Sequence, residues 1–144
     1  RGIELTGSFQ LTDNLLWKLN ATFSQNKIAE FNEFIDNWDT GLKDSVNHNN
    51  TDIAFSPSII GGSQLIFTPF KSLEYGKLDL ALVTKYVGDQ FIDNTSSKYA
   101  KLDAYLVNDF SLSYTVKTKL FKEININFQV NNLLNEVLLF HYPF

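Results

Sequence analysis

Hydrophobic and polar residues alternate one by one along most of the 144-residue chain. The clearest case is the segment from Leu102 to Val116, in which only Asn108 interrupts the apolar face. A period of two residues is typical of β-strands, because successive side chains point to opposite faces of a sheet. At about 3.3 Å per residue this segment would span roughly 50 Å, whereas strands of globular proteins usually have about 5–6 residues. The pattern therefore predicts a strand longer than a small soluble sheet needs.

The same alternation predicts an all-β chain, folded as an antiparallel up-and-down meander of about six long strands. The approximate strand ranges are 2–11, 15–29, 53–68, 76–88, 102–116 and 123–131, and the two long polar loops are 30–52 and 89–101. Within 53–68, the Gly61-Gly62 pair indicates a bulge or bend. Pro57 and Pro69 are expected near the ends of that strand, because proline cannot donate to a sheet ladder.

The connections between these strands alternate between short and long. In an up-and-down sheet every second connection lies at the same end, so the three short turns fall at one end and the two long loops at the other. Outer-membrane β-barrels have this asymmetry, with short periplasmic turns and long extracellular loops. A soluble sandwich has no physical reason to sort its loops in this way.

The apolar strand faces allow two interpretations. In a soluble sandwich they pack inward, whereas in a membrane barrel they meet lipid and the polar faces line the lumen. Strand length favours the barrel, because several predicted strands exceed the about 9–11 residues that cross a bilayer. Aromatic residues near strand ends also favour it, since such residues gather at membrane–water interfaces. They are Trp17, Tyr75, Tyr86, Phe91, Tyr99 and Tyr114.

Composition narrows the possible functions. The net charge of -4 argues against a nucleic-acid partner, which needs a concentrated basic surface. No segment approaches the about 18 consecutive apolar residues of a transmembrane helix. The absence of cysteine excludes a disulfide framework and a cysteine-ligated metal site. Because the chain begins at Arg1 without a signal peptide, we expect it to be a piece of a longer protein.

Catalytic chemistry has little support in the sequence. No nucleophile motif is present, and His48 and His141 are far apart with no partner at metal-ligand spacing. Carboxylates of the first long loop could gather a hard cation, although a solvated loop is the simpler interpretation. These residues are Glu30, Glu33, Asp36, Asp39, Asp44 and Asp52. We therefore predict that the chain is not an enzyme, and we assign no catalytic, cofactor or metal residue.

The first long loop also contains aromatic and amide side chains. Trp38, with Phe31 and Phe34, could stack on a ligand or pack the loop against the barrel, and packing is the favoured interpretation. The run Asn47 to Asn50 is interpreted as a turn or a polar contact surface. None of these residues is singled out as a substrate ligand, so the substrate-binding residues stay unknown.

Three segments together resemble the C-terminal part of a TonB-dependent outer-membrane receptor, in a style similar to members from Bacteroidetes-type bacteria. They are SPSIIGGSQLIFTPFKSLEYGKLDLALVTKYVGDQFIDNTSS, LDAYLVNDFSLSYTV and INFQVNNLLNE. The resemblance covers most of the chain from about Ile53 to Glu136, and the first hairpin is compatible with it. It lies in the order and spacing of the segments, since no single motif is diagnostic.

The resemblance implies a segment of a 22-stranded transmembrane barrel in the outer membrane, normally plugged by an N-terminal domain. It implies active transport of a scarce nutrient such as a ferric siderophore or cobalamin, bound at the extracellular loops. The partners implied are outer-membrane lipid and TonB, which engages an N-terminal region missing here. The final VLLFHYPF departs from the family pattern, so the closing strand is expected to be missing or altered.

Two other function classes stay open at this point. One is a soluble β-sandwich or jelly-roll module that binds a glycan or a protein ligand. The other is a passive, porin-like barrel. The sandwich predicts a closed two-sheet core, and the porin predicts that no plug domain lies upstream in the parent protein.

Overall fold

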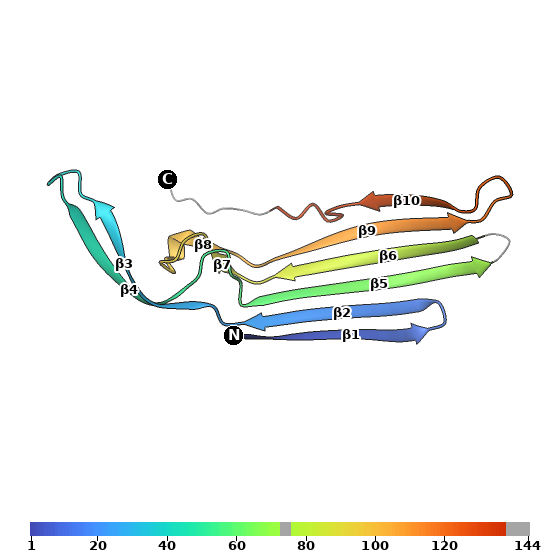
Figure 1. Ribbon diagram of the computed structural model, residues 1–144, viewed down its shortest axis with the longest axis horizontal. Helices are drawn as coiled ribbons and strands as arrows, with labels where there is room; N and C mark the ends of the chain where they lie inside the picture. The colour runs from blue at the N-terminus through green and yellow to red at the C-terminus, as the bar shows by residue number, and fades with distance from the viewer. Residues whose placement is uncertain (73–75, 138–144) are drawn as a thin grey trace.

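The computed structural model describes residues 1–72 and 76–137. Six long strands form one antiparallel sheet, in which each strand pairs with the next strand of the meander (Figure 1). The strands are β1 (Gly2–Thr12), β2 (Leu15–Ser24), β5 (Ile59–Ser72), β6 (Gly76–Val87), β9 (Tyr105–Val116) and β10 (Ile124–Val130). The predicted all-β, up-and-down meander is therefore confirmed.

Smaller elements lie in the two long connections. β3 (Lys27–Asp36) and β4 (Lys43–Asp52) pair as a hairpin, while β7 (Gln90–Phe91) and β8 (Lys101–Leu102) form a two-residue ribbon around the 3₁₀-helix η1 (Lys98–Ala100). Both units lie at one end of the sheet, and the β1–β2 and β9–β10 turns lie at the other end, as the spacing predicts (Figure 1). Among the described residues, no helix is long or apolar enough to cross a membrane.

Four predicted ranges differ from the structure. The predicted strand 102–116 begins only at Tyr105, because Leu102 pairs with Gln90 in the β7–β8 ribbon. The predicted loop 30–52 is mostly the β3–β4 hairpin, and the predicted strand 15–29 is interrupted after Ser24. At this break the Asn26 amide nitrogen Nδ2 donates to Ser24 Oγ and Ser56 Oγ, at 3.0 and 2.8 Å. The predicted strand 53–68 begins only at Ile59 and continues to Ser72. The hairpin has no simple alternating pattern because water can reach both of its faces, so neither face has to be uniformly apolar.

The bulge in β5 lies at Pro69 and not at the glycine pair. The register between β5 and β6 shifts between Phe67 and Phe70. Pro69 lies in this interval and has no backbone N–H to donate to the ladder, which is where bulges are found. Gly61 and Gly62 keep regular partners on both neighbouring strands, contrary to the expected bulge. A Cβ on Gly62 would lie 2.8 Å from the side-chain amide of Asn20, so glycine here makes room for that side chain.

The main sheet is a single layer with no apolar core. Within the described residues, the buried hydrophobic side chains are Ala81, Val87 and Ala100. Large apolar side chains instead line one exposed face of the sheet. They include Ile3, Leu5, Phe9, Leu11, Phe23, Ile59, Phe67, Leu82, Leu106, Ile126 and Phe128. A two-sheet sandwich would bury these residues, so the structure contradicts the soluble-sandwich alternative.

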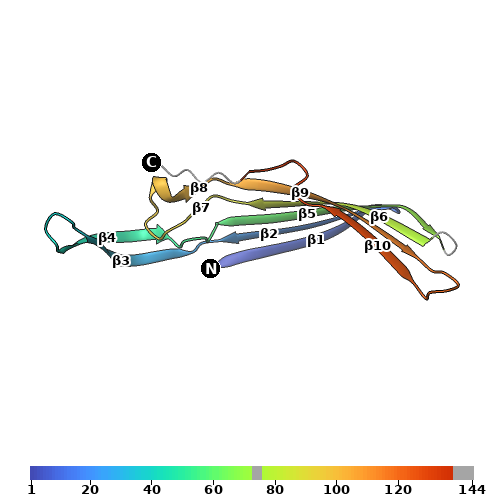
Figure 2. The ribbon, with the colours of Figure 1, turned by 90° about the horizontal axis from the view of Figure 1, so that it is seen from above.

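The polar face is the hollowed side of the sheet. Seen from above, the six strands lie in one curved layer (Figure 2). A hollow of about 600 Å³ is lined largely by residues of the polar face, close to the short turns. Its polar lining includes Gln10, Asp13, Asn14, Lys18, Gln64, Thr68, Lys71, Lys77, Asp79, Ser111 and Ser113. A polar concave face and an apolar outer face are the arrangement of a barrel wall in lipid.

One lateral row of polar side chains crosses the apolar face. Ser63, Thr84 and Asn108 are directly paired across β5, β6 and β9. Thr84 Oγ1 donates to Asn108 Oδ1 at 2.7 Å, and Trp17 Nε1 from the neighbouring row donates to Ser63 Oγ at 2.9 Å. Asn108, which interrupts the apolar pattern of the sequence, is therefore buried and hydrogen-bonded.

The NNLLNE segment after β10 forms a tight turn that is attached to β9. The backbone N–H of Asn132 donates to Asp109 Oδ1 at 2.7 Å, and the N–H of Leu133 donates to the Asn108 carbonyl at 2.6 Å. The Asn132 side chain accepts from the N–H of Glu136 and donates to its carbonyl, at 2.8 and 2.9 Å. The predicted absence or alteration of a closing strand concerns residues 138–144, which lie outside the described residues.

Candidate functional site at the long-loop end

The long-loop end combines the β3–β4 hairpin with the connection from residue 88 to residue 104. The hairpin projects beyond the main sheet, and the β7–η1–β8 unit lies near its base (Figures 1 and 2). Both units are polar and exposed, and the strands that support them continue into the main sheet. Binding residues often lie on loops held by a rigid scaffold, which makes this end the candidate site.

A ladder of amide side chains stabilises one face of the hairpin. Asn47 on β4 lies directly opposite Asn32 on β3. Its Nδ2 atom donates to Asn32 Oδ1 at 2.8 Å and to Glu30 Oε1 at 2.9 Å. Asn49 Nδ2 donates in turn to Asn47 Oδ1. Of the two interpretations of Asn47 to Asn50, the turn is therefore wrong, since these residues belong to β4, while the polar contact surface stays a prediction. Asn50 nevertheless has a positive φ of 54°.

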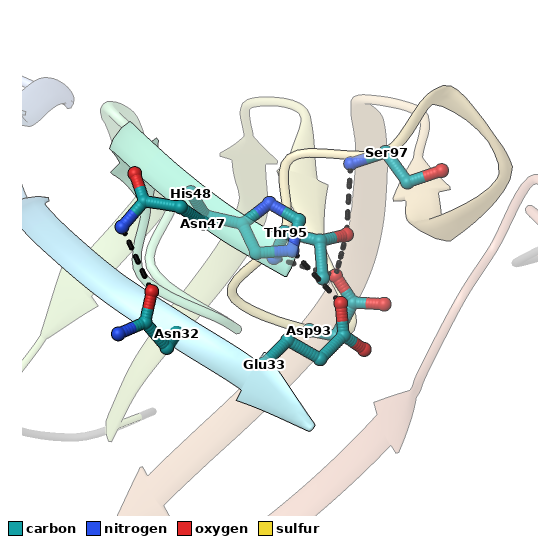
Figure 3. A network of polar contacts seen from close by, with 7 residues as sticks. All are labelled: Asn32, Glu33, Asn47, His48, Asp93, Thr95 and Ser97. Atoms are coloured by element: carbon teal, nitrogen blue, oxygen red, sulfur yellow. Dashed lines mark hydrogen bonds and ion pairs between the residues drawn. The ribbon is translucent and has the colours of Figure 1, made fainter. Parts of the chain in front are cut away.

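The opposite face of the hairpin holds its histidine. The rings of His48 and Phe31 are stacked, with an interplanar angle of 16° and their centroids 4.9 Å apart. His48 Nε2 lies 2.8 Å from Glu33 Oε2, in a contact that becomes an ion pair when the imidazole is protonated (Figure 3). The histidine is thus engaged within the hairpin. Across residues 1–72 and 76–137, no group of three or more acidic, histidine or cysteine side chains is placed to hold a metal ion.

The two long connections are joined to each other at the base of the hairpin. The N–H of Asp52 donates to Ser96 Oγ at 2.7 Å, and the N–H of Ala54 donates to Asn94 Oδ1 at 2.8 Å. The N–H of Phe55 donates to the carbonyl of Phe91 at 2.8 Å. Three backbone donors of the first connection therefore depend on acceptors of the second, which makes the two units one structural assembly.

The second connection is shaped by its own hydrogen bonds. Asp93 Oδ1 accepts from the N–H and the hydroxyl of Thr95, at 2.9 and 2.7 Å, and the N–H of Ser97 donates to Thr95 Oγ1 at 3.2 Å (Figure 3). Between them, Ser96 adopts a positive φ of 56°. This turn places the Ser96 hydroxyl where the N–H of Asp52 can reach it.

A charged pair closes the same connection. Lys101 Nζ lies 2.6 Å from Asp89 Oδ2. The hydrogen bond to Asp89, with the attraction of its charge, raises the pKa of Lys101 above its usual value. Lys101 therefore keeps its positive charge across the physiological range, and the pair holds the two ends of the connection together.

The structure does not gather the predicted carboxylates into a cation site. Glu30 and Glu33 lie on opposite faces of the hairpin. Asp52 is at its base, where Lys27 Nζ lies 3.0 Å from its Oδ1 atom. The remaining members, Asp36, Asp39 and Asp44, lie near the tip. The acidic residues of the first connection are therefore spread along the hairpin.

The aromatic residues of the hairpin also differ from expectation. Trp38 is 94% exposed, so it does not pack on the described part of this chain, and packing against the rest of the barrel stays a prediction. Phe34 is largely exposed as well, and Phe31 packs on His48. The second histidine of the sequence, His141, lies outside the described residues. The sequence alone could not decide whether Trp38 binds a ligand or packs, because its exposure at the tip depends on the fold.

Comparison with known proteins identifies the family. Residues 1–133 match the model of the TonB dependent receptor-like beta-barrel family. No match was found among curated proteins. Among solved structures, the chain is similar to the ferric yersiniabactin uptake receptor FyuA from Yersinia pestis, with 19% identity and a TM-score of 0.58. The match covers 94% of this chain and 18% of that receptor. The chain belongs to the TonB-dependent receptor-like β-barrel family.

Proposed function

We propose that the protein containing this chain is a TonB-dependent active transporter for a scarce nutrient such as a ferric siderophore or cobalamin. As a member of this family the chain lies in the outer membrane, with its long loops extracellular and its short turns periplasmic. The observation that carries the proposal is the family match over residues 1–133, on a sheet with an apolar outer face and a hollowed polar face.

The substrate class is argued from the loops and the lumen. The joined hairpin and second connection offer amides, hydroxyls and carboxylates at the extracellular end, which suit a polar ligand. The similar receptor FyuA takes up ferric yersiniabactin, and this supports a ferric siderophore as the first class to test. TonB is expected to act through a part of the protein outside this chain. An origin in Bacteroidetes-type bacteria stays a prediction.

The passive porin-like barrel is the second candidate function. A porin passes solutes down a gradient, whereas a TonB-dependent receptor needs energy from the inner membrane. Family members are transporters and not enzymes, which supports the prediction that the chain has no catalytic role. The need for energy therefore distinguishes the remaining candidates.

The experiment is uptake of ⁵⁵Fe-loaded siderophores by the source bacterium, its receptor-deletion strain and its TonB-deletion strain. We expect at least one siderophore to be taken up by the parent strain, and uptake to fall to background in both deletions and with a protonophore. Radiolabelled cobalamin is tested in parallel. Receptor-dependent uptake that survives the loss of TonB would support the porin. If neither ligand class needs the receptor, the proposed substrate classes are wrong.

A further inference from the structure

The tip of the β3–β4 hairpin carries large apolar side chains that no other described part of this chain covers. Trp38 is 94% exposed, Leu42 is 70% exposed and Phe34, near the end of β3, is 67% exposed. Single exposed apolar residues are common on protein surfaces, but three in one small region, including a tryptophan, are typical of an interaction surface. We call residues 34–44 the hairpin tip.

The turn that carries Trp38 is ordered by Asn37. Its Oδ1 atom accepts from the N–H groups of Asp39 and Thr40, at 3.0 and 3.1 Å, and its Nδ2 atom donates to Asp44 Oδ2 at 2.9 Å. Its carbonyl accepts from the N–H of Gly41, whose φ of 71° suits glycine. The backbone that carries Trp38 is thus fixed by a defined turn, so less backbone entropy is lost when the tip binds.

The hairpin carries an excess of negative charge. Residues 27–52 contain six carboxylates (Glu30, Glu33, Asp36, Asp39, Asp44 and Asp52) and two lysines (Lys27 and Lys43), a formal charge of -4. This equals the net charge of the whole chain, also -4. At the tip, Lys43 Nζ lies as far as 3.9 Å from Asp36 Oδ1, and both side chains are exposed. Such a pair contributes little, so the tip presents its acidic field to any partner.

The shape of the tip selects the kind of partner. Small-molecule sites are concave, whereas the hairpin projects away from the sheet (Figures 1 and 2). An exposed tryptophan on a projection suits insertion into a pocket of another macromolecule. The acidic field repels an anionic lipid surface and attracts a basic protein surface.

We propose that the hairpin tip docks a basic polypeptide outside the cell. Trp38 is the apolar anchor, Leu42 and Phe34 add further exposed apolar surface on the same tip, and Asp36 and Asp39 attract the basic groups of the partner. This interaction goes beyond the proposed transport function and does not depend on which nutrient is carried.

The test uses the complete receptor in nanodiscs made from zwitterionic lipid. The probe is a labelled peptide of alternating lysine and leucine, and the matched control peptide alternates glutamate and leucine. We expect the lysine peptide to bind and the glutamate peptide to bind at least 10-fold more weakly. Trp38→Ala is expected to weaken lysine-peptide binding about 10-fold, in the range of an interface anchor. Tyr99→Ala, which removes an exposed aromatic ring of the second connection, is the control and leaves binding unchanged.

Charge is tested with Asp36→Asn and Asp39→Asn together. This variant is expected to weaken binding and to reduce its dependence on salt, because fewer charges attract the peptide. Equal binding of the two peptides, or equal effects of Trp38→Ala and Tyr99→Ala, would overturn the proposal. So would Trp38-dependent binding to phosphatidylglycerol vesicles in place of the peptide, which would assign the tip to lipid.

Discussion

At the residue scale, two asparagines make structural hydrogen bonds that the alternation of apolar and polar residues does not predict. Asn108 interrupts the apolar face of its strand, where the sequence marks it as an exception. In the structure its Oδ1 atom accepts from Thr84 within a polar row that includes Ser63, so its buried amide oxygen has a hydrogen-bond partner. Asn132 adopts a positive φ of 51° and closes the turn after β10 with its side chain. Its role depends on a backbone conformation that asparagine tolerates better than most residues.

Replacement of Asn132 should separate the contributions of backbone conformation and hydrogen bonding. Asn132→Gly keeps the positive φ and loses the two side-chain bonds to Glu136, which should lower the free energy of unfolding by about 1 kcal/mol. Asn132→Ala also strains the backbone, so the loss should reach about 2 kcal/mol. The measurement is urea unfolding of the complete receptor in lipid vesicles.

The neighbouring Asn131 supplies the control for this series. Its side chain accepts from Gln129 in an exposed pair, so Asn131→Ala should change stability little. If Asn132→Ala lowered the free energy of unfolding no more than Asn131→Ala does, the stability of the turn would not depend on Asn132. If Asn132→Gly and Asn132→Ala had the same free energy of unfolding, the positive φ would impose no strain on alanine.

At the element scale, the strands of the main sheet were predictable and the hairpin was not. Lipid on one face and a polar lumen on the other impose a period of two residues, and the sequence shows it in β1, β2, β6 and β9. The β3–β4 hairpin has water around it, so Asn47 and Asn49 can occupy a strand by pairing their amides. Asparagine is depleted in strands generally, which is why this segment was predicted as a loop.

The joining of the two long connections could not be predicted from the sequence at all. Ser96 and Asn94 are forty or more positions from the residues whose N–H groups donate to them, and no local pattern reports such a contact. The same holds for the exposure of Trp38, which depends on the fold of the tip. The candidate site was therefore predicted in its location, at the long-loop end, and not in its internal contacts.

Loss of these acceptors should loosen the base of the hairpin. With Ser96→Ala and Asn94→Ala combined, the N–H groups of Asp52 and Ala54 lose their partners and should exchange with solvent about 10-fold faster, equivalent to roughly 1.4 kcal/mol. The measurement is hydrogen–deuterium exchange of the complete receptor in nanodiscs, followed in peptides spanning residues 50–56. Thr40→Ala at the hairpin tip is the control, because its hydroxyl accepts only locally, from Leu42. Unchanged exchange in the double variant would contradict the joined assembly.

At the scale of the whole molecule, the chain is a barrel wall and not a globule. Its sheet has two edges, on β1 and β10, and its apolar side chains face outward. Unpaired edges and a bare apolar face are not tolerated in isolation, in water or in lipid. The structural match, which covers only 18% of the similar receptor, agrees with a wall that needs the remaining strands.

The isolated chain should therefore fail to fold cooperatively in plain buffer. We expect it to aggregate and to bind a dye for apolar surface, and we expect detergent to relieve both effects while strand content is kept. Sedimentation, dye fluorescence and circular dichroism measure these properties. A soluble monomer with a sharp thermal transition and little dye binding would contradict the single-layer architecture.

The hydrogen bonds between the hairpin base and the second connection also have a consequence for how such receptors diversify. Two surface segments that share backbone hydrogen bonds are inherited best as a pair, since a substitution in one leaves donors unmatched in the other. Recombination that exchanges residues 25–58 alone between relatives would place the N–H donors of positions 52, 54 and 55 against the second connection of a different receptor, whose acceptors need not match them. The smallest exchangeable module is thus discontinuous, combining residues 25–58 with residues 88–104. Chimeras built on that module should keep their surface architecture where single-loop exchanges lose it.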